Sequence, residues 1–146
     1  QGMGKNIVHC GSGGLGQATK ICNNMLAGIN ALAAAEAMTM GERLGVSPDI
    51  LYEVISTSTG RSYIFETSNP MPDVCSTSPA NNKFKPGFMA KLMLKDLRLS
   101  QAAAQDAKTS TPLGAAATAA FQQLIDSGFG DLDTSSIIKV IKPESK

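Results

Sequence analysis

The sequence has no tryptophan, a single histidine and few aromatic residues of any kind, which make up 5% of its 146 residues. Its formal net charge is only +1 at pH 7. A balance this close to neutral, with few rings to stack on bases, leaves no basic face for nucleic acid and no acidic tail. His9 has no serine, cysteine or metal-ligand pattern around it, so we expect no chemistry from it. The sequence therefore predicts neither a nucleic-acid partner nor a metal site.

Cysteine is also scarce. The three cysteines, Cys10, Cys22 and Cys75, are odd in number and form no C-x-x-C spacing. This pattern excludes a disulfide framework and a zinc site, and it favours a reducing compartment. The longer apolar runs are interrupted by charges such as Glu36 and Lys95, and the first residues lack the layout of a secretory signal. We expect a soluble chain with no membrane partner and no targeting peptide of its own.

Apolar residues, by contrast, reach 42% and gather in alanine-, methionine- and leucine-rich runs. That is enough for one domain with its own core. Gly45 and Pro48 mark the end of one helix and the start of the next, and Pro112 lies in the first turn of another. No β-type alternation follows residue 10, so we expect an all-α, multi-helix domain with two long helices. The predicted helices cover about residues 15–44, 48–60, 61–68, 88–107, 110–128 and 133–142.

A polar, proline-studded segment, residues 69–87, separates the third predicted helix from the fourth. We expect a loop there. About twenty residues is long for a simple connection, and loops of that length usually carry a function or a partner surface.

The stretch GSGGLG raises the question of a dinucleotide fingerprint, since Gly11, Gly13 and Gly16 match G-x-G-x-x-G. That fingerprint also needs a second strand ending in an acidic residue about 20 positions later. Glu36 has the right distance but falls inside a predicted helix, and Gln17 stands where a phosphate-binding loop would have its lysine. We therefore interpret the glycines as a sharp turn into a helix whose first turn stays open to a small molecule.

Lys20 and Asn24 are four residues apart, so they share one face of this helix. An ammonium group near the positive end of a helix dipole is destabilised, which favours the neutral amine that a general acid/base needs. The alternative is an ordinary solvated lysine. Farther along the helix Glu36 interrupts a bulky apolar stripe, and we expect it to be buried against Arg43 or Arg61.

The spacing G-x-G-x-x-x-K-x-x-x-N, formed by Gly14, Gly16, Lys20 and Asn24, resembles the catalytic segment of the β-hydroxyacid dehydrogenases. The segments LGVSPDILYEVISTSTGRS, NPMPDV, SPANN and GFMAKLMLKDLRLS continue the resemblance along essentially the whole chain.

The resemblance implies the all-helical C-terminal half of a two-domain oxidoreductase, like the C-terminal domain of 6-phosphogluconate dehydrogenase-type enzymes. Residues 1–12 would end, or lead from, a missing N-terminal Rossmann domain that binds most of the NAD. Residues 13–146 would form the catalytic and oligomerisation domain, inactive alone. The implied partners are a small hydroxy acid and further copies in a homodimer or homotetramer, in the mitochondrial matrix of a eukaryote or otherwise in the cytoplasm.

The family's residue roles carry over to three positions. Lys20 would be the catalytic general acid/base, Asn24 would bind the substrate, and Lys95 would bind the cofactor. Without the resemblance, Lys95 could equally be a lysine at the border of the core whose stem lies along apolar surface. Two other functions remain open: an NADPH-dependent semialdehyde reductase of the same family, and a non-catalytic helical oligomerisation module.

Overall fold

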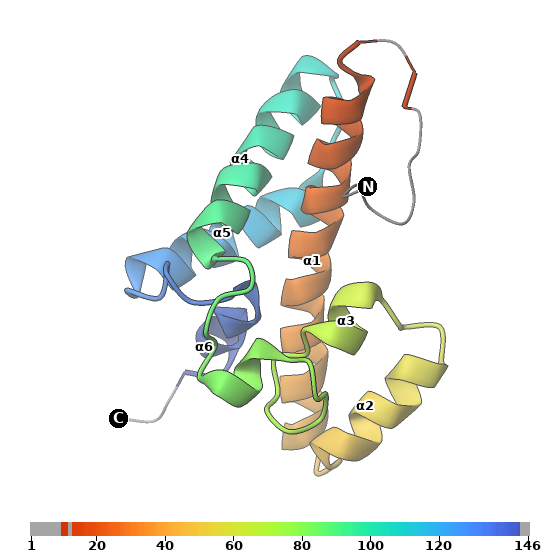
Figure 1. Cartoon of the computed structure of the whole chain (residues 1–146), viewed down its shortest axis with the longest axis vertical. Coiled ribbons are helices and arrows are strands. Elements are labelled where there is room, and N and C mark those ends of the chain that lie inside the picture. Colours follow the sequence, from red (N-terminus) through yellow and green to blue (C-terminus); the bar gives the residue numbers. More distant parts are fainter. Residues whose placement is uncertain (1–9, 12, 144–146) are drawn as a thin grey trace, which may run out of the picture.

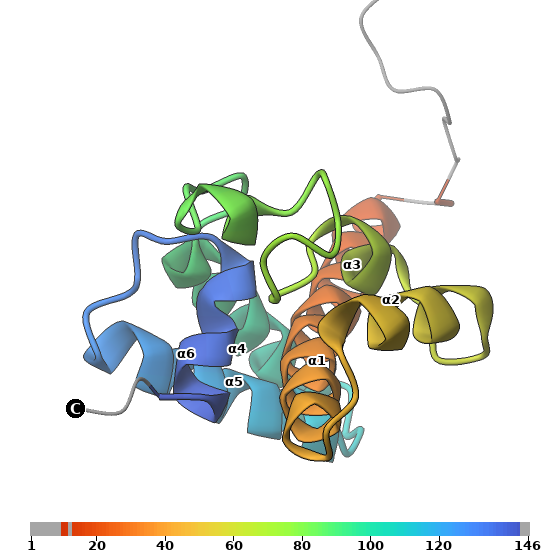
Figure 2. The ribbon, with the colours of Figure 1, turned by 90° about the horizontal axis from the view of Figure 1, so that it is seen from below.

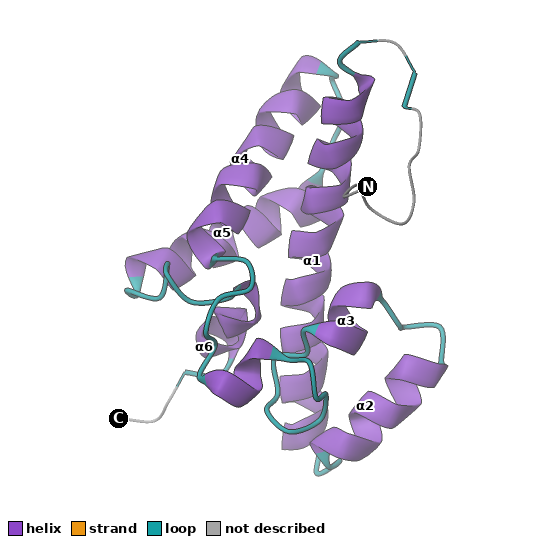
Figure 3. Cartoon of the chain, in the orientation of Figure 1, coloured by secondary structure: helices purple, strands orange, loops and turns teal. Residues whose placement is uncertain are grey.

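The computed structural model describes residues 10–11 and 13–143, and nearly all regular structure in them is helical (Figures 1 and 3). The one β-type pairing in this part of the chain is an isolated bridge between Met89 and Asp133. His9 and most of the predicted link at residues 1–12 lie outside the described residues. The elements in chain order are α1 (Leu15–Arg43), α2 (Pro48–Thr57), α3 (Tyr63–Thr67), the 3-10 helix η1 (Pro79–Asn82), α4 (Ala90–Asp106), α5 (Pro112–Asp126), the 3-10 helix η2 (Thr134–Ile137) and α6 (Ile138–Ile141).

Helix α1 is the long axis of the molecule, and the other helices pack along it (Figures 1 and 2). Its core face is made of small residues, with Ala31, Ala34 and Ala35 all buried. A Cβ added to Gly28 would lie 2.9 Å from Cδ2 of Leu97 on α4. The small residues therefore allow α1 and α4 to approach closely, which positions the side chains of the two helices against each other.

Larger apolar side chains from four elements fill the space around this alanine face. The largest that are completely buried include Met38 of α1, Leu97 of α4, Phe121 of α5 and Ile137 of η2. Burying one such side chain stabilises a fold by roughly 1.5–3 kcal/mol. None of the helices described is both long and apolar enough to cross a bilayer.

The helix boundaries follow the local signals closely. Gly45 has a left-handed φ of 91° just after α1, and Pro48 is the first residue of α2. Ser47 occupies the N-cap position as expected, although its side chain makes no capping hydrogen bond. At α3 the cap is formed by Ser62, whose hydroxyl accepts from the backbone N–H of Phe65 at 3.1 Å.

The predicted loop at residues 69–87 contains η1 and is tied together by side-chain hydrogen bonds. The buried Asn69 donates to the carbonyl of Phe65 at 3.2 Å and accepts from the N–H of Met71 at 3.1 Å. Asn81 accepts from the N–H of Asp73 at 2.7 Å and donates to the carbonyl of Cys75 at 2.8 Å. Hydrophobic periodicity carries no information about such side-chain hydrogen bonds. The sequence therefore predicted a loop at these residues but not the bonds that order it.

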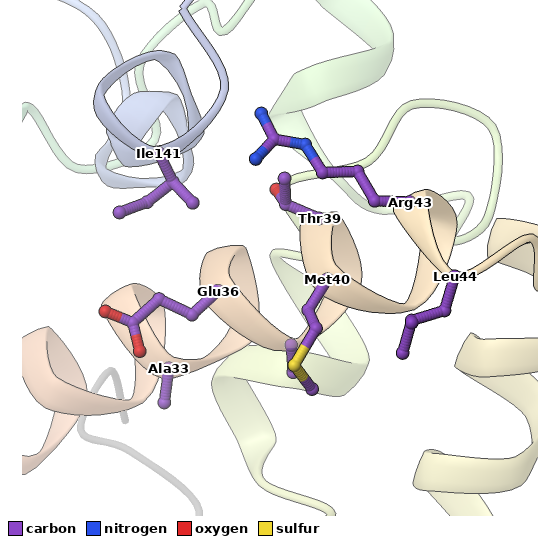
Figure 4. Close-up of a pocket in the computed structure, with 8 residues that line it drawn as sticks. Ala33, Glu36, Thr39, Met40, Arg43, Leu44 and Ile141 are labelled. Carbon is purple, nitrogen blue, oxygen red and sulfur yellow. The ribbon is translucent and has the colours of Figure 1, made fainter.

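The prediction that Glu36 is buried against an arginine is wrong. Glu36 is exposed, and among the described residues it forms no ion pair. The physical reason is that the C-terminal half of α1 packs through its alanine face, so that Glu36 and Met40, which is 62% exposed, lie at the surface (Figure 4).

Candidate active site

The first turns of α1 stay open, because glycine shapes the start of the helix. Gly14 is the N-cap residue and has φ 93°, a left-handed conformation that glycine adopts without strain. A Cβ placed on Gly13, Gly14 or Gly16 would have no atom within 4 Å. The backbone that precedes Lys20 is therefore accessible to a small molecule, as the glycine pattern predicted.

All three predicted site residues line one small hollow between α1 and α4. Lys20 and Asn24 enter it from α1, and Lys95 enters it from α4, together with Asp96. Both lysines are exposed and Asn24 is partly buried. Because the hollow holds only about 80 Å³, it is one edge of a site and not a complete binding cavity.

Asn24 is held by a carboxylate from the facing helix. Its Nδ2 donates to Oδ2 of Asp96 at 2.6 Å, and its Oδ1 accepts from Nδ2 of Asn23 at 3.2 Å. The bond to the Asp96 carboxylate is charge-assisted and therefore stronger than a bond between neutral groups, so it fixes the orientation of the amide. No sequence motif indicated a role for Asp96. It adjoins Lys95 in the sequence, but its partner is 72 positions away.

A larger hollow of about 630 Å³ opens on the other side of Lys20 and Asn24. Its wall carries several hydroxyl groups and two aromatic rings that the sequence did not assign to the site. Phe88 in this wall is 37% exposed, so it is not an ordinary core residue. The additional polar and aromatic side chains are Tyr63, Thr67, Ser68, Thr77, Phe88 and Thr134. They come from α3, η2 and loops between helices, and no local motif connects them.

Asp133 also lines the larger hollow, but both oxygens of its carboxylate already accept hydrogen bonds from nearby backbone N–H groups and a hydroxyl group. Oδ2 accepts from the N–H groups of Gly87 at 3.0 Å and Phe88 at 2.9 Å. Oδ1 accepts from the N–H and the hydroxyl of Ser135 at 2.9 and 2.8 Å. Asp133 therefore fastens the segment that carries Phe88 to the start of η2, and it is a structural residue.

Cys75 and Tyr52 form a pair behind this wall. The Cys75 thiol and the Tyr52 hydroxyl both donate to the carbonyl of Glu66, at 2.9 and 2.8 Å. Burial, and then the neighbouring Cys75, raise the pKa of Tyr52. Burial alone would raise the pKa of the Cys75 thiol, but hydrogen bonds, first of all from Thr77, outweigh it and lower that pKa.

Comparison with known proteins identifies the class to which this arrangement belongs. The profile of one family, described as NAD-binding of NADP-dependent 3-hydroxyisobutyrate dehydrogenase, matches residues 14–141. The class is that of the β-hydroxyacid dehydrogenases. The chain belongs to the family of NAD-binding domains of 3-hydroxyisobutyrate dehydrogenases.

Individual relatives agree with this assignment. The mitochondrial 3-hydroxyisobutyrate dehydrogenase of Drosophila melanogaster is 41% identical over 97% of this chain and 44% of its own length. The NAD-dependent L-serine dehydrogenase of Pseudomonas aeruginosa is 39% identical over 98% of the chain and 48% of its own length. The structure of Mycobacterium tuberculosis 3-hydroxyisobutyrate dehydrogenase with L-serine has a TM-score of 0.89 at 41% identity, over 93% of this chain and 46% of that one. The chain thus spans less than half the length of these relatives.

The family match corrects two expectations. We predicted an all-α C-terminal domain with the cofactor bound mainly by a preceding Rossmann domain, but the matched family is described as NAD-binding. The helices described here therefore belong to a domain family named for the cofactor itself. Our inference failed because it assigned most of the cofactor to a separate domain with a strand and a G-x-G-x-x-G fingerprint, and gave this chain only Lys95, whereas exposed lysines and an open helix start also attract a phosphate-bearing ligand.

Proposed function

We propose that this chain forms part of the active site of an NAD-dependent 3-hydroxyisobutyrate dehydrogenase, which oxidises 3-hydroxyisobutyrate to methylmalonate semialdehyde in valine breakdown. The observation that carries the proposal is the common hollow of Lys20, Asn24 and Lys95 between α1 and α4. We assign residues 13–146 to catalysis and assembly, and residues 1–12 to the connection with a further domain. The activity would then belong to a longer protein of the relatives' size.

The residues present fit a nicotinamide dinucleotide. Lys20 and Lys95 offer two exposed ammonium groups to an anionic ligand, and the start of α1 offers accessible backbone at Gly14. We assign Lys95 to the cofactor. When bound, the nicotinamide ring accepts the hydride that leaves the hydroxyl-bearing carbon of the substrate.

Lys20 is the proposed general acid/base. In the oxidation its neutral amine takes the hydroxyl proton of the substrate as the carbonyl forms, and in the reduction its ammonium group returns that proton. Asn24 lies one turn farther along the same face, so both side chains can reach one substrate oxygen. The bond from Asn24 to Asp96 fixes the amide that would orient the substrate.

L-Serine is a second candidate substrate, and a specific observation favours it. One relative is named an NAD-dependent L-serine dehydrogenase, and the Mycobacterium tuberculosis structure contains L-serine. Serine shares the carboxylate and the β-hydroxyl group of 3-hydroxyisobutyrate but replaces a methyl group with an ammonium group. A reductase of a related semialdehyde that uses NADPH remains a third alternative. A panel of these substrates with NAD and NADP, judged by kcat/KM on the full-length protein, separates them.

The role of Lys20 is tested with Lys20→Ala in the full-length protein. We expect kcat to fall at least about 100-fold, because general acid/base catalysis contributes 10²–10⁴-fold. Lys95→Ala should instead raise the KM for the cofactor, measured in the same assay. Circular dichroism checks that both variants are folded. Full turnover by Lys20→Ala would contradict the proposal and favour the alternative of a helical module without a catalytic role.

We also propose that the protein assembles as a homodimer or homotetramer through this chain. Its support is the large apolar surface that the fold leaves exposed, including Met40, Leu44, Ile50 and Val54, each more than half exposed. Exposed apolar patches of this kind commonly mark protein–protein contacts.

A further inference from the structure

The larger hollow beside Lys20 and Asn24 carries few charges. Within the described residues, Lys20 and Asp133 are the only charged side chains that line it, and Asp133 is buried in its wall. Lys20 and Asn24 also line the small hollow, so the remaining atoms of a substrate whose hydroxyl group lies at Lys20 are within reach of both hollows. The groups that the wall offers to those atoms therefore influence which hydroxy acid the site takes.

Two hydroxyl groups of this wall already donate their hydrogen atoms to the backbone. Oγ1 of Thr67 donates to the carbonyl of Tyr63 at 2.8 Å, and Oγ1 of Thr77 donates to the carbonyl of Thr67 at 2.9 Å. A hydroxyl group has one hydrogen to donate and two lone pairs with which to accept. Sγ of Cys75 lies 3.1 Å from Oγ1 of Thr77 and occupies at most one of them. Both threonines can thus accept a hydrogen bond from a ligand, but they donate none without breaking an existing bond.

The rest of the polar wall agrees with this preference for a donor. Tyr63 and Ser68 also line the hollow, and their hydroxyl groups can donate or accept, so they fit either kind of substituent. Asp133 adds a negative charge to the same wall. A substituent that donates hydrogen bonds, or carries a positive charge, is therefore complementary to this side of the site.

The candidate substrates differ at the carbon between the carboxylate and the hydroxyl-bearing carbon. 3-Hydroxyisobutyrate carries a methyl group there, L-serine carries an ammonium group, and glycerate carries a hydroxyl group. The ammonium and hydroxyl groups donate hydrogen bonds, whereas the methyl group neither donates nor accepts them. Apolar side chains of the same hollow, Ala27, Ile64 and Met93, offer contacts to the methyl group instead. The hollow can take either kind of substrate, but only the donor-bearing kind gains from the two threonines.

We propose that Thr67 and Thr77 are specificity-determining residues, which accept hydrogen bonds from a donor group on this carbon and give the protein activity on donor-bearing β-hydroxy acids. The reaction itself is unchanged: the hydroxyl-bearing carbon gives a hydride to the nicotinamide and its hydroxyl proton to Lys20, and a carbonyl group forms. The inference rests on the proposed function, because it takes the reacting hydroxyl group to lie at Lys20.

The test compares kcat/KM for 3-hydroxyisobutyrate, L-serine and glycerate in the full-length protein with NAD. Thr67→Val and Thr77→Val keep the shape of the side chain but replace the accepting oxygen with a methyl group. Each should lower kcat/KM for the donor-bearing substrates at least about tenfold and leave that for 3-hydroxyisobutyrate within about twofold. Thr77→Ser keeps the oxygen and should behave like the wild type. Activity on L-serine alone identifies an ammonium-bearing substrate, and activity on glycerate alone identifies a hydroxyl-bearing one.

Thr57→Val on α2 is the matched control, and it should change none of the three values. The Thr57 hydroxyl group makes the same kind of bond, to the carbonyl of Glu53 at 2.9 Å, but it does not line the hollow. Circular dichroism checks that every variant is folded.

A wild-type protein that oxidises 3-hydroxyisobutyrate but neither L-serine nor glycerate would overturn this inference and leave the proposed function intact. Equal losses for all three substrates in the valine variants would overturn it as well, because a distorted site affects every substrate alike. A wild-type protein that is active on none of the three would overturn the proposed function itself.

Discussion

At the scale of single residues, Asp96 controls the geometry of the candidate site although it carries none of the proposed chemistry. Its carboxylate lies 2.6 Å from the amide nitrogen of Asn24 and joins α4 to α1 within the hollow that holds both lysines. An asparagine without this partner would rotate between several orientations, and only some of them suit a bound substrate.

We therefore expect Asp96→Ala in the full-length protein to lower kcat/KM for the hydroxy acid about tenfold, the equivalent of roughly 1.4 kcal/mol. Asp96→Asn keeps an acceptor for Asn24 and should recover part of the loss. Asp106→Ala is the control, because it removes an exposed acidic residue from the end of the same helix. Equal kinetics for Asp96→Ala and the wild type would remove Asp96 from the site.

Tyr52 provides a pH-dependent contribution to stability. Its pKa is raised above the ordinary value of about 10 by burial and by Cys75. Above pH 10 the unfolded chain therefore loses this proton before the folded chain does, so the free energy of unfolding falls as pH rises through that window.

The variant Tyr52→Phe has no proton to lose, so above about pH 10 its free energy of unfolding should fall less steeply with pH than that of the wild type. Urea unfolding at several pH values measures the two slopes. Tyr63→Phe, at a ring that is 77% exposed, is the control. If the free energy of unfolding falls with the same slope against pH in the wild type and in Tyr52→Phe, the pKa of Tyr52 is not raised.

At the scale of elements, the contact between α1 and α4 sets the distance between the two halves of the candidate site. Gly28 lies in this contact, since an added Cβ would meet Cδ2 of the fully buried Leu97 at 2.9 Å and Sδ of Met93 at 3.1 Å. Lys20 and Asn24 lie on the same helix as Gly28, and Lys95 and Asp96 lie next to Leu97 on the other.

Gly28→Ala should destabilise the fold by about 1–2 kcal/mol, because overpacking at a buried contact outweighs the gain in helix propensity. Gly16→Ala is the matched control on the same helix. Its added Cβ meets no atom within 4 Å, so only the propensity gain remains and the change should stabilise by up to about 1 kcal/mol. Shifts of the urea midpoint in opposite directions, lower for Gly28→Ala and higher for Gly16→Ala, would agree with this account. A Gly28→Ala variant that is more stable than the wild type would contradict it.

At the scale of the whole molecule, the fold separates two surfaces along one helix. The open N-terminal turns of α1 hold the candidate active site, and the C-terminal end of α1 carries the exposed Met40 and leads into the exposed Leu44. The apolar surface that supports the proposed assembly is therefore distant from Lys20 along the helix. The chain spans less than half of the relatives' length, and the candidate site in it is open on one side.

The sequence by itself determined the main helices and which of the proposed site residues share a helical face. Gly45, Pro48 and Pro112 act on the backbone next to them, and Lys20 and Asn24 share a face because helical geometry alone places residues four apart together. These are local effects, which a linear pattern records.

Only the tertiary structure decided which face of α1 is buried and which distant residues complete the site. The alanine face of α1 is buried in the core because its small side chains let α4 approach, and Glu36 and Met40 therefore lie at the surface. The partner of Asn24 is 72 positions away, and the hydroxyl-bearing wall comes from α3, η2 and loops between helices. Contacts between distant segments depend on how helices pack in three dimensions, and no spacing along one chain encodes that directly.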